Sequence, residues 1–362
     1  MVFAASDYTH MSHALQLAKN GLFTTSPNPR VGCVIVNNDE MVGVGWHEQA
    51  GEAHAEINAL RDAGNLAKGA TVYVTLEPCS HYGRTPPCSE ALIHAGVRKV
   101  VIAMEDPNPC INGRGKQKLQ AAGIEVQTGL LAEEAGQLNI GFMTRMRYGR
   151  PWIRSKLASS LDGKVALKNG KSQWITAEPA RQDGHRWRAR SCAILTGIGS
   201  VRHDNPQLTV RHVETTRQPV RIVVDSNLEI SLQAKLVQPI ATTWIFTARD
   251  NRNKISQLEK MGVHVFVLPD TSGKVDLKTM MAKLAELDIN ELLVEAGSVL
   301  NGALLATGLI NEIIFYFAPN LLGHTAQSML ALPEMTDLSD KYKLRITDVR
   351  KIGKDIRVVA RL

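Results

Sequence analysis

The chain has 362 residues, of which 44% are hydrophobic, so it is long enough for two domains that each bury a full core. Its formal net charge of +7 permits a nucleic-acid partner but equally suits small phosphorylated ligands, and no run of like charges forms a basic tail. Its 5 cysteines are scattered, which argues against a disulfide framework, and no apolar run is long enough for a membrane span; we therefore expect a cytoplasmic protein that contacts no membrane.

The first half alternates short strands and helices. Asp7 is predicted to cap a helix that ends at Gly21, and the turn around Asp39 predicts a hairpin between strands at 31–36 and 41–47. Further helices are predicted at 53–63, 88–95 and 117–122, and further strands at 71–76, 99–104 and 124–129. This order predicts an α/β domain.

The alternation restarts near Arg147, so we expect one domain over residues 1–147 and a second over 148–362. Strands are predicted in the second half at 152–158, 192–197, 219–226, 242–248, 263–268, 291–297 and 312–319. Helices are predicted at 178–190, 276–288 and 298–307, with another that ends at 261. Strands that alternate with helices indicate a mostly parallel sheet.

Three potential metal ligands fall in the first half. His54 and Glu56 stand at the start of a predicted helix, in an H-x-E pattern that is common without a metal. Downstream, Cys79 follows Pro78 just after a strand, and Cys88 begins a helix. One histidine and two cysteines leave the fourth tetrahedral position for water, which is the arrangement of a catalytic zinc. The order H-x-E, P-C, C is typical of zinc deaminases that act on nucleobases, in which the glutamate shuttles protons.

The spacing of the two cysteines departs from the usual P-C-x-x-C, because eight residues separate Cys79 from Cys88. Two free thiols in a loop are therefore an alternative interpretation. The long loop between them carries His81 and Arg84, side chains that suit an anionic or polar group of a substrate.

Two loops of the second half place glycines between a strand and a helix. One runs through Gly197 and Gly199 toward Asp204, and the other runs through Gly297 into a helix. Such junctions let backbone amides approach a phosphate at a helix N-terminus. Neither loop is a full G-x-G-x-x-G, so tight turns without a ligand explain these glycines equally well.

These stretches together resemble one family, the bifunctional riboflavin-biosynthesis proteins, in which a pyrimidine deaminase is fused to a ribosyl reductase. The resemblance covers nearly the whole chain and rests on PNPRVGCVIV, GEAHAEINAL, TLEPCSHYGRTPPC, DPNP, KLASSLDGKVA, SQWIT, DNPQLTVR, RIVVDS and VEAGSVLNGALL. The long cysteine spacing is this family's own variant. The resemblance implies a cytidine-deaminase-like zinc domain followed by a dihydrofolate-reductase-like domain. It also implies two reactions: a diaminohydroxy-ribosylaminopyrimidine phosphate loses an amino group as ammonia, and NADPH then reduces the ribosyl side chain to ribityl.

The resemblance further implies roles for individual residues. It implies that His54, Cys79 and Cys88 bind zinc and that Glu56 is the proton shuttle. It also implies that Lys156 is a lysine of the reductase site, although by residue type alone Lys156 would be an ordinary surface lysine. Residues similar to the family's NADPH contacts are Ala158, Trp174, Ser200, Asp204, Ser226, Gly297, Ser298, Val299, Leu300, Asn301, Gly302 and Ala303. Residues similar to its substrate contacts are Asn28, His81, Arg84, Ser172, Arg188, Leu208, Arg211 and Glu295. By residue type alone, Trp174 and Leu208 would be core residues and Arg188 a solvated helix position.

Three other functions fit parts of the sequence. A nucleic-acid deaminase, for example one that edits tRNA adenosine, shares the H-A-E and P-C patterns, but an aromatic content of 5% is low for stacking single-stranded bases. A dehydrogenase with a structural zinc would require a fourth protein ligand, for which Cys110 and His81 are the nearby candidates. The third alternative is a member of the resembled family that has lost one of its two activities. We expect a small phosphorylated pyrimidine as substrate, no nucleic-acid partner, and a homo-oligomer, either a dimer or a tetramer.

Overall fold

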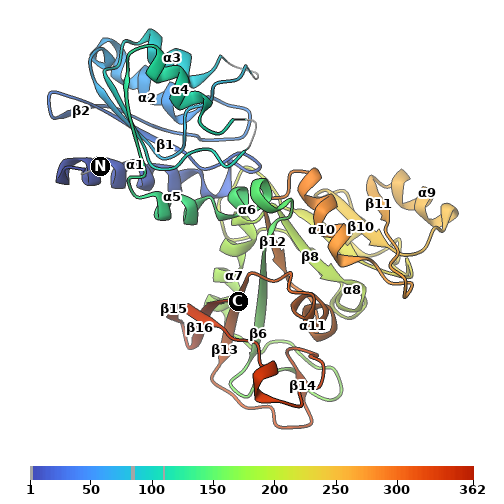
Figure 1. Cartoon of the computed structure of the whole chain (residues 1–362). Helices are drawn as coiled ribbons and strands as arrows, with labels where there is room; N and C mark the ends of the chain where they lie inside the picture. Colours follow the sequence, from blue (N-terminus) through green and yellow to red (C-terminus); the bar gives the residue numbers. More distant parts are fainter. Residues whose placement is uncertain (1–2, 83–85, 109–110) are drawn as a thin grey trace. The chain divides into compact units, whose positions relative to one another are not determined.

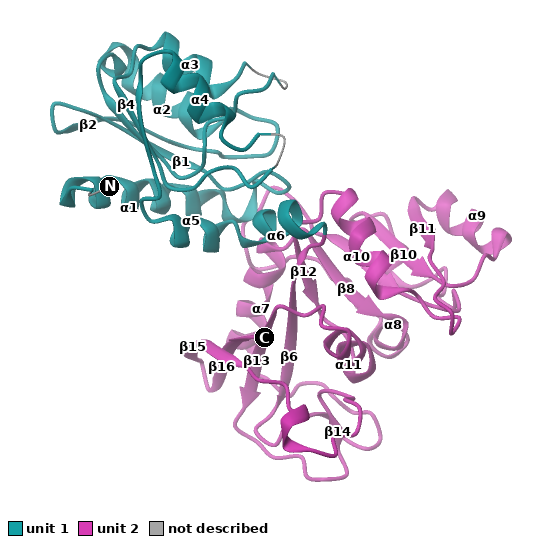
Figure 2. Cartoon of the chain, in the orientation of Figure 1, with its two compact units in different colours: residues 1–149 teal, residues 150–362 magenta. Residues whose placement is uncertain are grey.

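The computed structural model describes residues 3–82, 86–108 and 111–362, and the chain forms two compact units, residues 1–149 and 150–362 (Figures 1 and 2). The boundary between the units follows residue 149, two residues beyond the boundary expected from the sequence. Arg84 and Cys110, both singled out above, lie outside the described residues.

Unit 1 is built on a five-stranded sheet of order β2-β1-β3-β4-β5, antiparallel at β2-β1-β3 and parallel at β3-β4-β5. Its strands are β1 (Gly32–Asn37), β2 (Glu40–Trp46), β3 (Thr71–Val74), β4 (Lys99–Ile102) and β5 (Glu125–Thr128). Its helices are α1 (Ala5–Asn20), α2 (Ala55–Ala63), α3 (Cys88–His94), α4 (Arg114–Ala121), α5 (Ala132–Leu138) and α6 (Ile140–Tyr148). The predicted hairpin and the α/β class are confirmed.

Helix α1 begins at Ala5, two residues before the predicted cap, and ends at Gly21 as predicted. Asp7 lies inside the first turn, where its carboxylate accepts a hydrogen bond from the Ala4 N–H at 2.8 Å and another from the Tyr73 hydroxyl at 2.7 Å. The expected capping position is therefore wrong, but Asp7 still satisfies the helix start and ties it to β3. The helix packs so closely on β1 that a Cβ on Gly32 would lie 1.9 Å from the Ala14 carbonyl oxygen.

Unit 2 contains a nine-stranded sheet of order β11-β10-β9-β8-β12-β6-β13-β16-β15, which is parallel from β11 to β13 and antiparallel at its last two strands. These strands are β6 (Trp152–Ser160), β8 (Ala193–Gly197), β9 (Val220–Val224), β10 (Thr243–Thr247), β11 (Val263–Val267), β12 (Glu291–Val294), β13 (Glu312–Ala318), β15 (Arg345–Ile352) and β16 (Asp355–Arg361). The predicted mostly parallel sheet is confirmed.

Helices cover both faces of this sheet. They are α7 (Glu178–Arg190), α8 (Ile198–Asp204), α9 (Arg252–Lys260), α10 (Leu277–Glu286) and α11 (Ser298–Ala306). Side chains of α10 and α11 pack with Leu292 and Val294 of β12, whereas α7 packs with Leu293, which points to the opposite face. Helices α8 and α9 pack with Ile194 of β8, on the same face as α7. The carboxyl ends of the parallel strands therefore form one edge between two helical layers, where α/β proteins bind ligands.

The sequence patterns did not predict several elements. These are α5, α6, the hairpin β15–β16, and a two-stranded ribbon of β7 (Lys164–Ala166) and β14 (Gln327–Ser328). Most residues of β15 are exposed because it is the last strand of its sheet, so it lacks the buried alternation that identifies a strand. Among the described residues, no helix combines the length and apolarity that a bilayer crossing requires.

Candidate active sites

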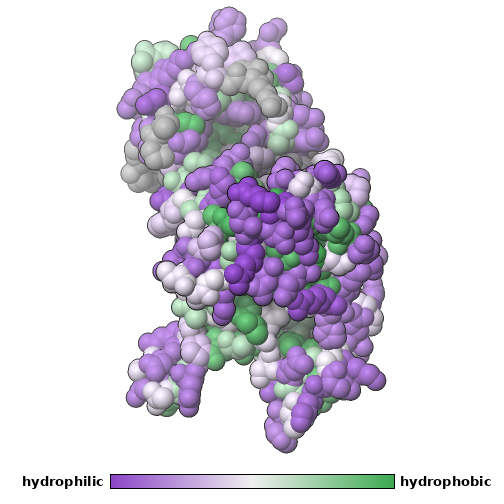
Figure 3. Space-filling view, turned by 90° about the vertical axis from the view of Figure 1, so that its right-hand side faces the viewer, coloured by the Kyte–Doolittle hydropathy of each residue, from purple (hydrophilic) through white to green (hydrophobic). Residues whose placement is uncertain are grey.

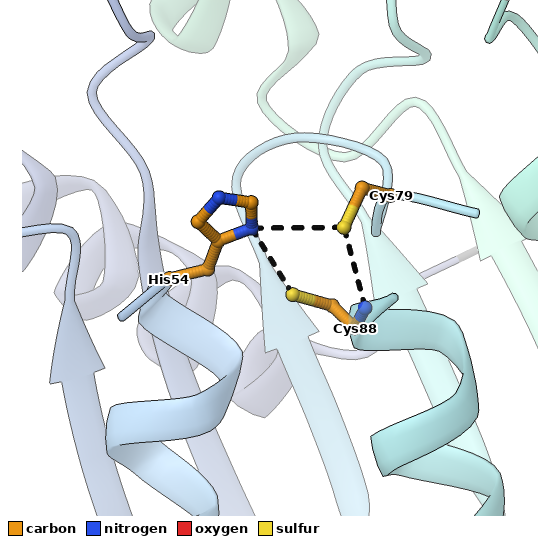
Figure 4. A group of neighbouring side chains, drawn as sticks. All are labelled: His54, Cys79 and Cys88. Atoms are coloured by element: carbon orange, nitrogen blue, oxygen red, sulfur yellow. Dashed lines mark hydrogen bonds between the residues drawn. The ribbon is translucent and has the colours of Figure 1, made fainter. Parts of the chain in front are cut away.

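Three side chains of unit 1 converge on one point. The Nδ1 atom of His54 lies 3.2 Å from Sγ of Cys88 and 3.6 Å from Sγ of Cys79 (Figure 4). Zinc bonds of about 2.1 Å to nitrogen and 2.3 Å to sulfur give ligand-to-ligand distances of roughly 3.6 Å in a tetrahedron. The three ligand atoms, all within 4.8 Å of one another, therefore fit a zinc ion without rearrangement of the backbone.

Local structure explains this convergence. His54 is the N-cap residue of α2, Cys88 is the first residue of α3, and Cys79 follows β3. The Cys88 N–H at the start of α3 donates a hydrogen bond to Sγ of Cys79 at 3.2 Å. Hydrogen bonds from Cys88, together with His54, lower the pKa of the Cys79 thiol to about 4 despite its partial burial. The thiolate form of Cys79, which binds zinc, is thus favoured, whereas the hydrogen bond with Cys79 and burial raise the pKa of the Cys88 thiol.

Glu56 lies in the first turn of α2 and is only 3% exposed. Burial raises the pKa of its carboxyl to about 7, and the Cys88 thiol is its hydrogen-bonding neighbour. A buried acid with this pKa beside the three ligands has the properties of a general acid/base.

A histidine that the sequence patterns did not single out borders this cluster. His47 is buried, and its ring stands edge-on to that of His54 with 5.5 Å between the ring centroids. Nδ1 of His47 donates to the Ala53 carbonyl at 3.0 Å, so Nε2 is free to accept from the Asn28 side-chain amide at 3.1 Å. His47 therefore orients Asn28, one of the predicted substrate contacts, next to the cluster.

Glu77 is a second residue that sequence reasoning missed. Its buried carboxylate accepts backbone hydrogen bonds from Asp106, Gly113 and Lys116 at 3.0–3.1 Å. A Cβ on Gly115 would lie 2.0 Å from the Pro78 carbonyl oxygen, so α4 packs directly on the segment that carries Cys79. These contacts fix the position of the middle zinc ligand.

The loop between the cysteines is less informative. His81 is exposed and does not belong to the cluster of metal ligands in the described part of unit 1. The neighbouring Tyr82 hydroxyl donates to Glu90 at 2.6 Å, which ties this part of the loop to α3.

In unit 2, the structure brings together Arg188 and Glu295, both predicted substrate contacts. Nε and Nη2 of Arg188 donate to the two carboxylate oxygens of Glu295 at 2.5 and 2.9 Å, and each side chain is about 15% exposed. Although burial opposes ionisation, Arg188 and then Lys156 lower the pKa of Glu295 to about 2. Arg188 is thus paired and largely buried rather than a solvated helix position.

Lys156 is partly buried on β6, so the interpretation as an ordinary surface lysine is wrong. Burial lowers the pKa of its ammonium, and the charge of Glu295 offsets part of that effect. Its Nζ lies 5.8 Å from the centroid of the Tyr316 ring, whose hydroxyl donates to Asp183 at 2.6 Å.

The other predicted substrate contacts differ in exposure. Leu208 is buried and Ser172 is half-buried, whereas Arg211 is exposed and donates to Thr209 Oγ1 at 3.1 Å. The Arg211 N–H donates to Nδ1 of His185 at 3.0 Å. Burial and then the Arg188 charge lower the pKa of His185 to about 4, so this ring is neutral at physiological pH.

The predicted cofactor contacts fall into two groups. Ser200 lies close to Gly297, since a Cβ on that glycine would be 3.9 Å from the serine Oγ, and the N-terminal ends of α8 and α11 are therefore neighbours. Trp174 is 70% exposed, with the Arg181 guanidinium 4.6 Å from its ring centroid, so it is not a core residue. Exposed or half-buried positions are Ala158, Asp204, Ser226, Ser298, Val299, Leu300 and Ala303.

Asn301 and Gly302 instead face the protein interior. The Asn301 side chain accepts from the Ser155 hydroxyl at 2.7 Å and donates to the Ala296 carbonyl at 2.7 Å. A Cβ on Gly302 would lie 2.0 Å from the Ala331 carbonyl oxygen. These two residues support α11 and its loop, and their own contacts are with the protein.

Comparison with known proteins accounts for both units. Residues 4–104 match the cytidine and deoxycytidylate deaminase zinc-binding region, and residues 151–358 match the RibD C-terminal domain. The riboflavin biosynthesis protein RibD of Escherichia coli K12 is 47% identical over 97% of this chain and 98% of its own length. The chain belongs to the RibD family.

Structural comparison agrees with this assignment. RibD of Acinetobacter baumannii superposes with a TM-score of 0.91 at 42% identity over 98% of both chains. A Thermotoga maritima structure, described as a diaminohydroxyphosphoribosylaminopyrimidine deaminase and 5-amino-6-(5-phosphoribosylamino)uracil reductase, gives 0.86 at 34% identity over 98% of both chains. The RibD relationship also decides the open alternatives. The two cysteines belong to a zinc-binding region rather than to a loop of free thiols, and unit 2 is a RibD reductase domain rather than an accessory domain of a tRNA deaminase.

Proposed function

We propose that this chain catalyses two consecutive steps of riboflavin biosynthesis, hydrolytic deamination of diaminohydroxy-ribosylaminopyrimidine phosphate in unit 1 and NADPH-dependent reduction of the ribosyl side chain in unit 2. The observation that carries the first step is a buried carboxylic acid beside three zinc ligands. The second step is supported by the RibD reductase domain and by Lys156, Arg188 and Glu295 at the carboxyl edge of its sheet.

In unit 1, His54, Cys79 and Cys88 would hold zinc, which would supply Lewis-acid activation of a water molecule. Glu56 is placed to take a proton from the attacking water and to deliver a proton to the departing amino group, so that ammonia leaves. Its pKa of about 7 lets one carboxyl perform both transfers near neutral pH. Asn28, held by His47, presents its amide oxygen to a substrate N–H.

In unit 2, NADPH, when bound, would supply the hydride for the reduction at C1′ of the ring-opened ribosylimine. The imine nitrogen must gain a proton in the same reaction, and Lys156 is placed to donate it because burial weakens its hold on the proton. Glu295 keeps its negative charge near Lys156, which prevents the ammonium from losing its proton before the substrate binds. Arg211, exposed and lightly bonded, is available to a sugar phosphate.

The decisive experiment incubates the purified protein with the phosphorylated pyrimidine, first without and then with NADPH, and follows the product by mass spectrometry. Without the cofactor, we expect only the exchange of an amino group for a hydroxyl. With NADPH, we expect a further gain of two hydrogens. A chain that has lost the reductase activity would stop after the first mass change. A chain that has lost the deaminase activity would show no mass change unless the already deaminated compound were added.

Two broader expectations accompany this proposal. The described cysteines Cys33, Cys79, Cys88 and Cys192 form no disulfide, which fits a protein that acts in the reducing cytoplasm. We also expect a dimer or tetramer, because Ile346 and Val349 of the outermost strand β15 are 63% and 60% exposed and offer an edge for pairing. Light scattering on the eluting protein measures the assembly directly.

A further inference from the structure

The proposed function requires NADPH but leaves open how the chain distinguishes it from NADH. The two cofactors differ only in the phosphate on the 2′-oxygen of the adenosine ribose. A site that prefers NADPH therefore needs a cation at the adenosine end, and sites for NAD place an acid there instead.

The order of the strands indicates where the adenosine end lies. Lys156 on β6 and Glu295 after β12 mark the reacting end, and Ser200 and Gly297 mark the neighbouring helix starts after β8 and β12. Beyond β8 the same edge continues to β9 and β10, which run parallel to it. Four strand spacings separate β6 from β10, roughly 19 Å, so a dinucleotide bound at this edge with its nicotinamide near Lys156 would reach the ends of β9 and β10.

A wide-open surface cavity of about 780 Å³ lies at that place. Asn227, the residue directly after Ser226, lines one side of it, and the segment 248–253 that follows β10 lines the other. Two arginines, Arg249 and Arg252, belong to the lining. Figure 3 views the chain from the side that carries α9, and the surface there is predominantly hydrophilic.

The acids near this cavity are already engaged. Asp225, which ends β9 where an NAD site would place its acid, is fully buried and accepts a hydrogen bond from the Ile230 N–H at 2.7 Å. Asp250 is paired with Arg252 at 2.8 Å. Asp225 therefore lies below the surface, out of reach of a ribose hydroxyl, and the charge of Asp250 is balanced by Arg252.

The two arginines of the lining differ in whether their guanidinium groups are already paired. Arg252 is 84% exposed and neutralises Asp250. Arg249 is anchored through its backbone N–H, which donates to Thr247 Oγ1 at 3.1 Å. Within residues 3–82, 86–108 and 111–362, its guanidinium has no hydrogen bond or ion pair. An unpaired guanidinium presents the planar fork that binds a phosphate through two parallel hydrogen bonds.

We propose that Arg249 binds the 2′-phosphate of NADPH and sets the cofactor preference of the reductase. This inference rests on the proposed reductase function and adds the residue that reads the cofactor. Ser226 lies beside the cavity, but its Oγ already accepts from the Val275 N–H at 3.1 Å, so it contributes at most one donor.

The test uses the full chain and two soluble probes, adenosine 2′,5′-bisphosphate and 5′-AMP, measured by isothermal titration calorimetry. The wild type should bind the bisphosphate about 10–100-fold more tightly, which corresponds to charge-assisted hydrogen bonds to one phosphate. Arg249→Ala should bind both probes equally, and Arg249→Lys should retain part of the preference, because lysine keeps the charge but not the fork. Lys351→Ala is the control, because it removes an exposed cation of β15, at the opposite end of the sheet, and it should keep the full preference.

Steady-state kinetics separate the possible failures. Arg249→Ala should raise KM for NADPH by about 10–100-fold, without a comparable rise for NADH. If the wild type itself binds both probes equally and uses NADH as well as NADPH, the proposed cofactor is wrong. If the wild type prefers NADPH and Arg249→Ala keeps that preference, or Lys351→Ala loses as much, the assignment to Arg249 is overturned while the reductase function stands.

Discussion

Arg154 is a buried cation whose removal should destabilise unit 2. Its side chain is 2% exposed on β6 and pairs with Glu291, 1% exposed, on β12 and with Glu312, 5% exposed, on β13. Its guanidinium carbon also lies 5.7 Å from the centroid of the Trp187 ring. The arginine thus ties three adjacent strands at the centre of the sheet, and we predict the effect of Arg154→Met from these contacts.

The loss in the free energy of unfolding depends on which buried charges the substitution leaves unpaired. Loss of one partner from a buried ion pair costs about 3–5 kcal/mol, because the remaining charge is unpaired in the interior. Here neither carboxylate is left alone, since Arg190 lies 2.9 Å from Glu291 and Arg361 lies 3.1 Å from Glu312. We therefore expect the lower end, about 3 kcal/mol, which lowers the melting temperature of a unit this size by roughly 6–12 °C.

Tryptophan fluorescence during urea or thermal unfolding measures this loss, because four of the 5 tryptophans lie in unit 2. Arg350→Met is the control, since Arg350 is 66% exposed in its pair with Asp348 and should contribute less than about 1 kcal/mol. A variant Arg154→Met as stable as Arg350→Met would refute the reasoning.

The pH dependence provides an independent check. Although burial opposes ionisation of Glu312, Arg154 and Arg361 lower its pKa below the ordinary value. A carboxyl with a depressed folded-state pKa stabilises the protein above its unfolded pKa, and that stability is lost as the pH falls through the folded value. The difference between wild type and Arg154→Met should therefore be largest near neutral pH and shrink below about pH 4.3, the ordinary pKa of glutamate.

Three further predictions concern the two activities. Glu56→Gln should retain zinc, measured by atomic absorption, but lose about 10²–10⁴-fold in ammonia release, and normal deamination would remove Glu56 from the mechanism. Gly115→Ala should disturb the Cys79 segment, because a Cβ there would meet the Pro78 carbonyl, and should weaken zinc retention against a chelator. The control is Gly136→Ala, at a half-buried position of α5 where no atom lies within 4 Å of the added Cβ. A fragment that begins at Arg147 should reduce the already deaminated compound, since unit 2 has its own cores, whereas a folded but inert fragment would contradict a self-contained reductase site.

The zinc site could be predicted because its information is local. His54 and Glu56 are two residues apart on one helix turn, and Cys79 and Cys88 each stand at the end or start of a regular element. The residues that support this site could not be found in the same way. The hydrogen-bond partners of Glu77 lie 29–39 residues further along the chain, and the sequence around Glu77 does not indicate that its carboxylate caps α4. Long-range pairs of this kind become visible only when the fold brings them together.

The same limit applied to the fold. The parallel strands of unit 2 were predictable because each is a continuous apolar run between helices. Strand β15 escaped because both of its faces are largely exposed, and α5 escaped because it has only 7 residues and includes a glycine. Burial expected from residue type was also wrong at single positions. Trp174 would be a core residue by type, but it lies on a loop with its ring on Arg181, and no property of the tryptophan itself reveals that.

The pairing of Arg188 with Glu295 divides the predicted substrate contacts into two roles. Arg188 gives Nε and Nη2 to Glu295, and Nη1 donates to the Thr209 carbonyl at 3.0 Å. The fork that would grip a phosphate is thus already occupied by a carboxylate of the same shape. Arg188 therefore holds Glu295 ionised and in place beside Lys156, whereas the exposed guanidinium of Arg211 remains the better phosphate ligand. In the proposed reductase, Arg211 would bind the substrate phosphate, Glu295 is the fixed acid at the centre of the edge, and Arg249 at its far end would bind the cofactor.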